Sequence, residues 1–465
     1  MTTSGIGHGC RGHHGSCRHA DVVGGVAQNT RFAVFRRKST PHRRNRTRPG
    51  AEVGVTGRGP GYRVGMPPTS PADVDVPITL RNLGRVRVLG ALVRAHRLSR
   101  TDLVRRTGLA RATVGSVTAD LIRSGIVTDE GAIPGGNPGT GRPPRALALN
   151  PASAYAVGVD IGHDHIRVML CDLVGAPVRD HVLPRAVDHD AAAVLTRTAE
   201  LVDQVRREAG VPADRVLGVG VGIACPVDRD GALRAEGIMP GWVGVRPAEE
   251  LHGRTGFPVS LVNDANAGVL AEHRYGAARE SGDVVYLRLS TGIGAGLLCA
   301  GRLLLGSGGL AGELGHLSVE PHGLICRCGN RGCLETVANP TAITRLLTAV
   351  AGAAVSTADL VDLVRAGDRG AIRAVADAGE AVGRALAQAV TMFNPELVVI
   401  GGELVATGEV LLESVRNAVR RNAMGSHTQR LRVVPGALGD SAGARGAAAL
   451  VLNDAPERLA ALLAG

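Results

Sequence analysis

Aromatic residues are scarce in this sequence of 465 residues, which includes four phenylalanines, four tyrosines and one tryptophan. Proteins that bind single-stranded nucleic acids stack the bases on aromatic side chains, so this scarcity argues against that class. Long apolar runs are also lacking, because the longest uncharged stretch, residues 146–159, contains a proline and is shorter than the roughly 18 apolar residues of a membrane span. The first ten residues lack the apolar core of a secretion signal. We therefore expect a cytoplasmic protein with no membrane contact.

The net charge of +11 comes from two N-terminal segments. Residues 1–75 carry twelve basic and four acidic side chains, and residues 79–150 carry twelve arginines and four acidic side chains. The rest of the chain has 29 basic and 34 acidic residues and is mildly acidic. Concentrated positive charge is typical of segments that bind DNA phosphates. The charge pattern thus divides the chain into a basic leader, a basic domain and a body.

The leader, residues 1–76, mixes glycine, arginine, histidine and proline without a period of 2 or 3.6. Such a segment cannot bury a core, so we expect it to be disordered. Its histidines and cysteines between His8 and His19 lack regular spacing, which favours a solvated tail over a metal site. The arginine-rich run 36–48 is suited to non-specific DNA contacts. An alternative is that translation starts at Met66, just before the first organised segment.

Residues 77–150 have the pattern of a winged helix-turn-helix. Apolar residues at helical spacing predict one helix over 80–96, a second that ends at Gly108, and a third over 110–124. Ser99 and Asp102 have the spacing of a capping box at the start of the second helix. The third helix would expose side chains suited to a major groove. The predicted groove contacts are Arg111, Thr113 and Ser116.

A plain helical hairpin with a solvated basic face is the alternative for this segment. Two strand-like runs, 126–128 and 146–149, argue against it, because they would pair and frame the intervening loop as a wing. Arg142 and Arg145 lie in a Gly/Pro-rich part of that loop, where they are suited to phosphates or a narrow minor groove. We therefore predict a domain that binds double-stranded operator DNA.

The body, residues 151–465, alternates strand and helix patterns, which indicates an α/β fold. A hairpin of two buried strands is predicted over 156–170, and helices over 191–208, 267–275 and 374–392. Further strands are predicted at 216–223, 259–262, 284–289 and 397–400. Two halves begin at Asp160 and near Asp283, each with a strand followed by a glycine turn. This duplicated pattern predicts two lobes around a cleft.

Two motifs in the body have the chemistry of a ligand site. Gly292, Gly294 and Gly296 follow a predicted strand, where bare glycines allow backbone N–H groups to approach a phosphate or sugar. Glycines of a tight hairpin would give the same pattern. Asn263 and Asp264 lie where a strand meets a helix, and a carboxylate there can accept a sugar hydroxyl's hydrogen bond or take its proton. The alternative role for one of these two residues is a helix N-cap.

A third motif predicts a metal site. Cys326, Cys328 and Cys333 are clustered, and His316 would complete the four ligands of a closed tetrahedral zinc site. A redox-active thiol cluster is the alternative. Glu313 and Glu335 flank the cluster, so a metal that fixes this loop would bring both carboxylates near the hydroxyls of a bound polyol.

These motifs resemble the ROK family (repressor, open reading frame, kinase), across nearly all of residues 151–465. The resemblance rests on Asn263-Asp264, the segments 312–316 and 332–335, and Gly401-Gly402. It implies a duplicated actin-like, hexokinase-like (ribonuclease H-like) two-lobe fold, with zinc held by the histidine and the three cysteines. It also implies a catalytic base at Asp264 in members that are kinases. The sugar contacts that it implies are Asn263, Asp264, Glu313, His316 and Glu335.

Two hypotheses follow from the resemblance. Kinases of the family carry Asp-x-Gly-Gly-Thr where this chain has Asp160-Ile-Gly-His163-Asp164. A carboxylate about 4 Å from a phosphate charge costs roughly 4 kcal/mol at an effective dielectric near 20, so ATP use is doubtful. We favour a sugar-responsive transcriptional repressor, a homodimer or homotetramer on palindromic operators. The alternative is an ATP-dependent sugar kinase that carries a DNA-binding domain.

Overall fold

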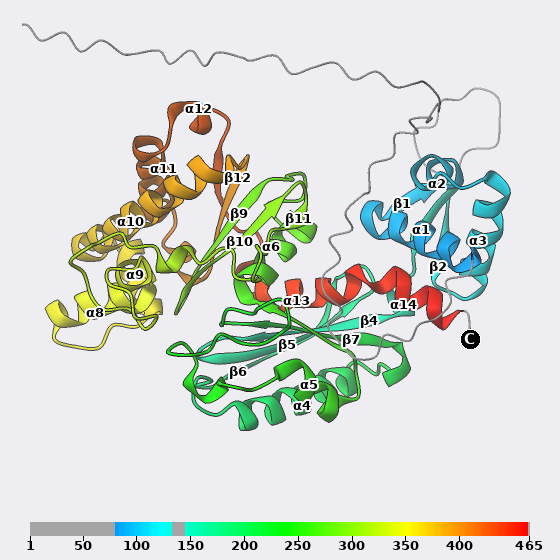
Figure 1. The fold of residues 1–465 in the computed structure, drawn as a ribbon, viewed down its shortest axis with the longest axis horizontal. Helices are drawn as coiled ribbons and strands as arrows, with labels where there is room; N and C mark the ends of the chain where they lie inside the picture. The colour runs from blue at the N-terminus through cyan, green and yellow to red at the C-terminus, as the bar shows by residue number, and fades with distance from the viewer. Residues whose placement is uncertain (1–79, 133–144, 464–465) are drawn as a thin grey trace, which may run out of the picture. The chain divides into compact units, whose positions relative to one another are not determined.

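The structure of the protein is a computed structural model that describes residues 80–132 and 145–463 (Figure 1). The predicted leader, residues 1–76, with its alternative start at Met66, lies outside the described residues, and so does Arg142 of the wing loop. Within the described part of the chain, no helix has the length and apolar character needed to cross a membrane.

The N-terminal domain confirms the predicted three helices and the paired strands of a wing. Its helices are α1 (Leu80–Ala95), α2 (Arg100–Thr107) and α3 (Arg111–Arg123), and its strands are β1 (Arg97–Ser99), β2 (Val127–Ala132) and β3 (Arg145–Leu149). The strands form an antiparallel sheet in the order β1-β3-β2, in which β1 was not predicted. The capping box is present, because Ser99 Oγ accepts from Asp102 N at 3.1 Å and Ser99 N donates to Asp102 Oδ2 at 3.2 Å.

The first lobe of the body is a five-stranded sheet in the order β6-β5-β4-β7-β8. Its elements are β4 (Tyr155–Ile161), β5 (His165–Asp172), β6 (Pro177–Pro184), β7 (Val216–Ile223), β8 (Val259–Asn263), α4 (Ala191–Glu208) and α5 (Pro247–Thr255). Alternate residues of β4, such as Val157 and Val159, pack into a core with α4. Both α4 and α5 lie on one face of this sheet, and α13 (Ala442–Asn453) lies on the other (Figure 1).

The second lobe repeats this arrangement in the order β11-β10-β9-β12-β13. Its strands are β9 (Val284–Leu289), β10 (Ile293–Cys299), β11 (Arg302–Leu303), β12 (Leu397–Gly401) and β13 (Arg432–Pro435). Val285 and Leu287 pack towards α10 (Arg369–Phe393), whereas Val284 and Tyr286 pack against α6 (Asp264–Tyr275). In both lobes three antiparallel strands precede two parallel ones, which confirms the predicted duplication. The remaining helices of the lobe are α7 (Glu335–Ala338), α8 (Pro340–Ala351), α9 (Thr357–Arg365), α11 (Glu409–Asn422) and α12 (Gly425–Thr428).

The backbone of helix α13 packs unusually close to strands β4 and β7 of the first sheet. A Cβ atom at Gly158 of β4 would lie 1.9 Å from the carbonyl oxygen of Ala444, and one at Gly220 of β7 would lie 1.8 Å from that of Ala447. Only glycine permits this approach of helix and strands. The chain then continues into α14 (Ala455–Leu462), which packs against α1 of the N-terminal domain within one shared core.

The single tryptophan lies in the first lobe. Trp242 is fully buried, and its indole Nε1 donates a hydrogen bond of 2.9 Å to the carbonyl of Val187. It ends the short 3-10 helix Pro240–Trp242. The buried indole therefore fixes the loop that joins β7 to α5.

Candidate functional site

A polar pocket lies at the carboxyl ends of the parallel strands, the edge of an α/β sheet where ligands usually bind. Its walls come from residues 162–165 after β4, 224–226 after β7, and 290–294 in the turn between β9 and β10. The structure brings together there all five residues predicted to contact a sugar, which are Asn263, Asp264, Glu313, His316 and Glu335. Distant segments of the chain thus converge on one site.

Asn263 and Asp264 occupy the junction of β8 and α6 in different roles. Asn263 is the N-cap of α6, since its Oδ1 accepts from Ala265 N at 2.9 Å and Asn266 N at 3.3 Å. The Asp264 side chain is 13% exposed, and its Oδ2 lies 3.3 Å from Arg288 Nη1. Burial raises the pKa of Asp264 above its ordinary value, against the opposing effect of Arg288. Asp264 is therefore the better placed of the two for a ligand.

Glu313 and Glu335 differ in how many of their carboxylate oxygens already have hydrogen-bond or ion-pair partners. Glu335 Oε2 accepts from the backbone N of Ile293 at 3.0 Å, and Oε1 lies 3.1 Å from Arg327 Nε. Glu313 keeps more of its carboxylate open, with Oε2 3.9 Å from His316 Nε2. Burial, with the charges of Asp264 and Glu335, raises the pKa of Glu313 to about 7. Glu313 can accept hydrogen bonds from ligand hydroxyls directly, whereas Glu335 mainly orders the pocket wall.

Several charged residues of this site were missed at the level of sequence. Arg288 of β9 pairs with both Asp264 and the fully buried Asp160, whose Oδ2 lies 3.2 Å from Arg288 Nη1. His165 lies between Asp160 and Asp164, at 3.6 Å from the first carboxylate and 2.8 Å from the second. Burial lowers the pKa of His165, but its hydrogen bonds to these two aspartates raise it to about 9. The cations Arg288 and His165 thus neutralise most of the negative charge on the three aspartates.

The glycines of the predicted phosphate loop have separate functions. Gly292 and Gly294 line the pocket, whereas Gly296 is not among the lining residues. A Cβ at Gly296 would lie 2.5 Å from the carbonyl of Ala265, so this glycine allows β10 to pack closely on α6. The alternative of a tight hairpin also applies, because β9 and β10 pair antiparallel across a turn of three residues that includes Gly292.

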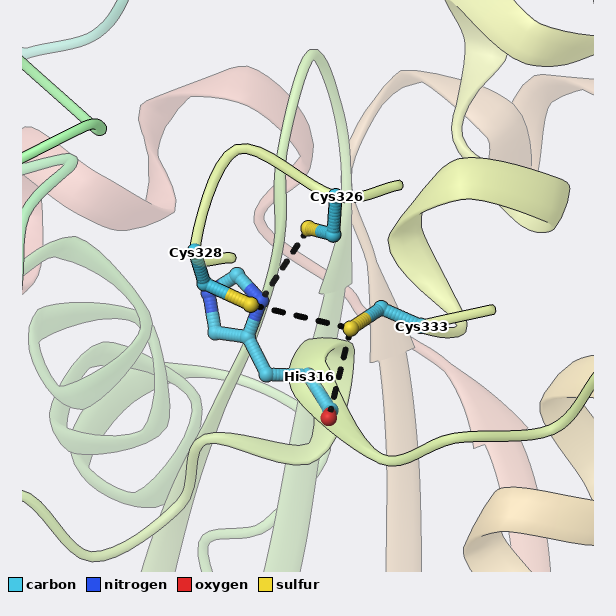
Figure 2. Close-up of side chains that lie close together, drawn as sticks. All are labelled: His316, Cys326, Cys328 and Cys333. Carbon is cyan, nitrogen blue, oxygen red and sulfur yellow. Dashed lines mark hydrogen bonds between the residues drawn. The ribbon is translucent and has the colours of Figure 1, made fainter. Parts of the chain in front are cut away.

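His316, Cys326, Cys328 and Cys333 form a cluster in which the candidate ligand atoms all lie within 4.8 Å of one another (Figure 2). Cys328 Sγ is 3.7 Å from Cys333 Sγ, and Cys326 Sγ is 3.6 Å from His316 Nδ1. Tetrahedral zinc with Zn–S bonds of about 2.3 Å separates two sulfurs by roughly 3.8 Å, so these spacings fit the metal. Because Nδ1 faces the sulfurs, Nε2 of the same ring faces Glu313 in the pocket.

The predicted DNA-contacting residues differ in how they are engaged. Arg111, Thr113 and Ser116 are exposed on α3, while Val114 and Val117 are buried beneath them. Arg145 is exposed at the base of the wing, where its Nε lies 2.8 and 2.9 Å from the two carboxylate oxygens of Asp129. Ala110, the N-cap of α3, makes no side-chain capping bond. The described part of the domain thus leaves one face of α3 exposed.

The two lobes and their pocket define a protein of the sugar-kinase type of fold, joined here to a domain of three helices and a three-stranded sheet. A family model described as the ROK family matches residues 156–454, about two thirds of the chain. The chain belongs to the ROK family. This membership confirms the resemblance identified in the sequence.

The relatives include repressors and sugar kinases, which are the two classes of protein in the hypotheses above. The xylose repressor of Caldicellulosiruptor bescii is 26% identical over 81% of this chain and 96% of its own length. The glucokinase of Thermotoga maritima is 37% identical, but over 63% of this chain and 96% of its own. A crystal structure of a ROK family transcriptional regulator, a homologue of the Escherichia coli Mlc protein, matches with a TM-score of 0.69 at 26% identity, covering 83% of this chain and 99% of its own. The chain therefore aligns with nearly the full length of both the xylose repressor and the transcriptional regulator.

Proposed function

We propose that the protein is a sugar-responsive transcriptional repressor, in which the domain 77–150 binds operator DNA and the body 151–465 binds a sugar or sugar derivative that releases it. The observation that carries this proposal is the pocket of carboxylates with the Asn263 amide, in a chain whose helix α3 exposes Arg111, Thr113 and Ser116. Carboxylates accept hydrogen bonds from the hydroxyls of a polyol. The proposal implies a cytoplasmic protein whose partners are double-stranded DNA and a small sugar.

We also propose that the cluster of His316, Cys326, Cys328 and Cys333 holds a structural zinc ion. Three thiolates and an imidazole leave no open position on a tetrahedral metal, so the ion would stabilise the loop rather than catalyse a reaction. The loop 317–334 contains no helix or strand of its own, only isolated bridges such as Ser318 with Cys333. A bound metal would supply the order that secondary structure does not.

An ATP-dependent sugar kinase is the second candidate, because Asp264 lies in the pocket near Gly292 and Gly294. Three features weigh against it. His163 and Asp164 both line the pocket where the family's kinases carry small residues. Arg288 occupies Asp264 Oδ2 in an ion pair at 3.3 Å, which leaves this oxygen less open to the proton of a sugar hydroxyl. We therefore propose that ATP is not a substrate of this protein.

A panel of sugars separates these proposals. D-xylose, D-glucose and N-acetyl-D-glucosamine would each be tested for an increase in melting temperature, and then for release of a DNA duplex selected by the protein from a random library. We expect one of them, or a derivative, to stabilise the protein and weaken DNA binding without consuming ATP. Sugar-dependent ATP consumption would support the kinase, and a panel without effect on stability or DNA binding would contradict the repressor.

The Arg111→Ala variant is expected to lose sequence preference. Arg111 is exposed in the first turn of α3, where a recognition helix reads base edges, and one bidentate contact contributes about 1–3 kcal/mol of discrimination. Binding to the selected duplex should therefore weaken about 5- to 100-fold, while binding to random DNA changes little. Fluorescence anisotropy with both duplexes measures the effect, and Arg365→Ala on the exposed face of α9 is the matched control. Equal loss on both duplexes would contradict base readout by Arg111.

The proposal of a DNA-binding repressor also implies two-fold symmetry in the oligomer and in the DNA that it binds. A homodimer, or a homotetramer built from dimers, would present two copies of α3 to the DNA, so the selected duplexes should be palindromic, with half-sites about one or more helical turns apart. The described wing contributes Arg145, whose pairing with Asp129 orients it at the base of β3.

A further inference from the structure

Arg288 links the two lobes at the floor of the pocket. It extends from β9 of the second sheet and is 13% exposed, and its Nη1 lies 3.2 Å from Asp160 of β4 in the first sheet and 3.3 Å from Asp264. Asp160 is fully buried, so its charge depends on this partner and on His165. A buried carboxylate that loses its cation is strongly destabilised. Asp160 and Arg288 must therefore move together.

A ligand at Asp264 competes with Arg288 for the same oxygen. Asp264 Oδ1 already accepts from the backbone N of Ala265 at 2.7 Å, and Oδ2 is the atom that Arg288 contacts. Asp264 is in the pocket, whereas Asp160 is not among its lining residues. A sugar hydroxyl that donates to Asp264 Oδ2 would weaken one of the two ion pairs and leave the other intact, which favours a shift of Arg288 towards Asp160.

Asp160 in turn contacts the first turn of α13. A Cβ atom at Gly443 would lie 2.2 Å from Asp160 Oδ2, so nothing separates this carboxylate from the helix backbone. Helix α13 is buried along most of its length and packs closely on β4 and β7. Closely packed elements transmit small displacements instead of absorbing them. A shift of Asp160 would therefore displace α13 as a unit.

The far end of α13 leads to the DNA-binding domain. Helix α14 follows within two residues, and the carbonyl of Leu463, just after it, accepts a hydrogen bond of 3.0 Å from Arg85 Nη1 of α1. Arg85 is 8% exposed, and its Nη2 also lies 3.7 Å from Asp120 Oδ2 on α3. These contacts thus connect the pocket floor to helix α3 through Arg288, Asp160, α13, α14 and Arg85.

We propose that Arg288 transmits sugar binding to the DNA-binding domain: a hydroxyl that engages Asp264 moves Arg288 and Asp160 against α13, and α14 carries this movement to Arg85 and α3. This inference rests on the proposed sugar-responsive function and assigns the residues that couple its two sites. The coupling is a ratio, the sugar dissociation constant with the DNA duplex bound divided by that of the free protein. Thermodynamic linkage requires sugar to weaken DNA binding by the same factor.

The experiment measures this ratio in the full chain with the sugar that gives the largest thermal shift among D-xylose, D-glucose and N-acetyl-D-glucosamine. The first variant is Asp160→Asn with Arg288→Gln, which removes both members of the buried Asp160–Arg288 ion pair together and leaves Asp264 in the pocket without its arginine partner. The second is Gly443→Ala, which places a methyl group against Asp160 from outside the pocket. The control is Arg167→Gln, which removes an arginine of β5 that pairs with Asp180.

Wild type and Arg167→Gln are expected to show a ratio of about tenfold or more, within the usual range of allosteric coupling. Gly443→Ala should bind the sugar within about threefold of wild type, and in both test variants the ratio should fall towards one. A wild-type ratio in Gly443→Ala, or in a double variant that still binds sugar, would overturn the proposal while the repressor function stands. A wild type that binds neither sugar nor duplex would instead overturn the proposed function, and this inference with it.

Discussion

Cys326→Ser is expected to be purified without zinc and to be less stable than wild type by several kcal/mol. Cys326 is almost fully buried, and its sulfur lies 3.6 Å from His316 Nδ1, so a hydroxyl at this position removes one of four ligands. Structural zinc contributes apparent binding free energies of about 10–16 kcal/mol in isolated peptides, and that energy stabilises the fold that forms the site. Elemental analysis and thermal unfolding measure the two effects.

The loss of order in the Cys326→Ser variant should extend from the metal cluster to the pocket. Arg327 and Glu335, which pair at 3.1 Å, are carried by the same loop or directly follow it, so disorder there would remove one wall of the site. Cys299→Ser is the matched control, because Cys299 is exposed at the end of β10 and is outside the cluster. Wild-type protein that is stable and active with no bound metal would contradict the zinc proposal.

Glu313→Ala is expected to weaken sugar binding about 10- to 100-fold and to leave sugar-free DNA binding unchanged. Above the Glu313 pKa of about 7 the carboxylate is charged. Hydrogen bonds to a charged group contribute about 1.5–3 kcal/mol, and each 1.4 kcal/mol corresponds to a factor of ten. Glu313 makes no contact with the N-terminal domain among the interactions described, so the variant should remain bound to DNA when the sugar is added.

Isothermal titration and DNA-binding anisotropy with increasing sugar measure this prediction. Glu249→Ala is the matched control, since Glu249 lies on α5 with a side chain that is 66% exposed and is outside the pocket. A Glu313→Ala variant that releases DNA at the same sugar concentration as wild type would show that this carboxylate is not a principal sugar contact.

Local patterns accounted for much of the fold and half of the site. Ser99 with Asp102 and the spacing of Cys326, Cys328 and Cys333 are signals within a few residues of sequence, and the structure contains the corresponding capping box and cluster. Arg288 gave no such signal, because its partner Asp160 is 128 residues away. A single arginine within a strand pattern does not predict which residue it will pair with. Ion pairs between lobes depend on the tertiary fold, which no local pattern encodes.

Helix α13 was missed for a different reason. Ten of its twelve residues, most of them alanine or glycine, are buried, so it has no polar face against which an apolar face could be recognised. Its small residues are explained by the elements they touch, which are the strands at Gly158 and Gly220 and helix α6 at Ala267. Amphipathic periodicity identifies helices with one solvated side, such as α4, and does not identify a helix that is buried on all sides.

The buried tryptophan has a consequence for spectroscopy. Because Trp242 is the only indole in the sequence, fluorescence excited at the red edge of tryptophan absorption originates from a single residue in the core of the first lobe. Its apolar surroundings should give blue-shifted emission in the folded protein and a red shift on unfolding of the first lobe alone. The protein thus contains its own optical probe, and unfolding of this lobe can be followed separately from that of the other parts without a label.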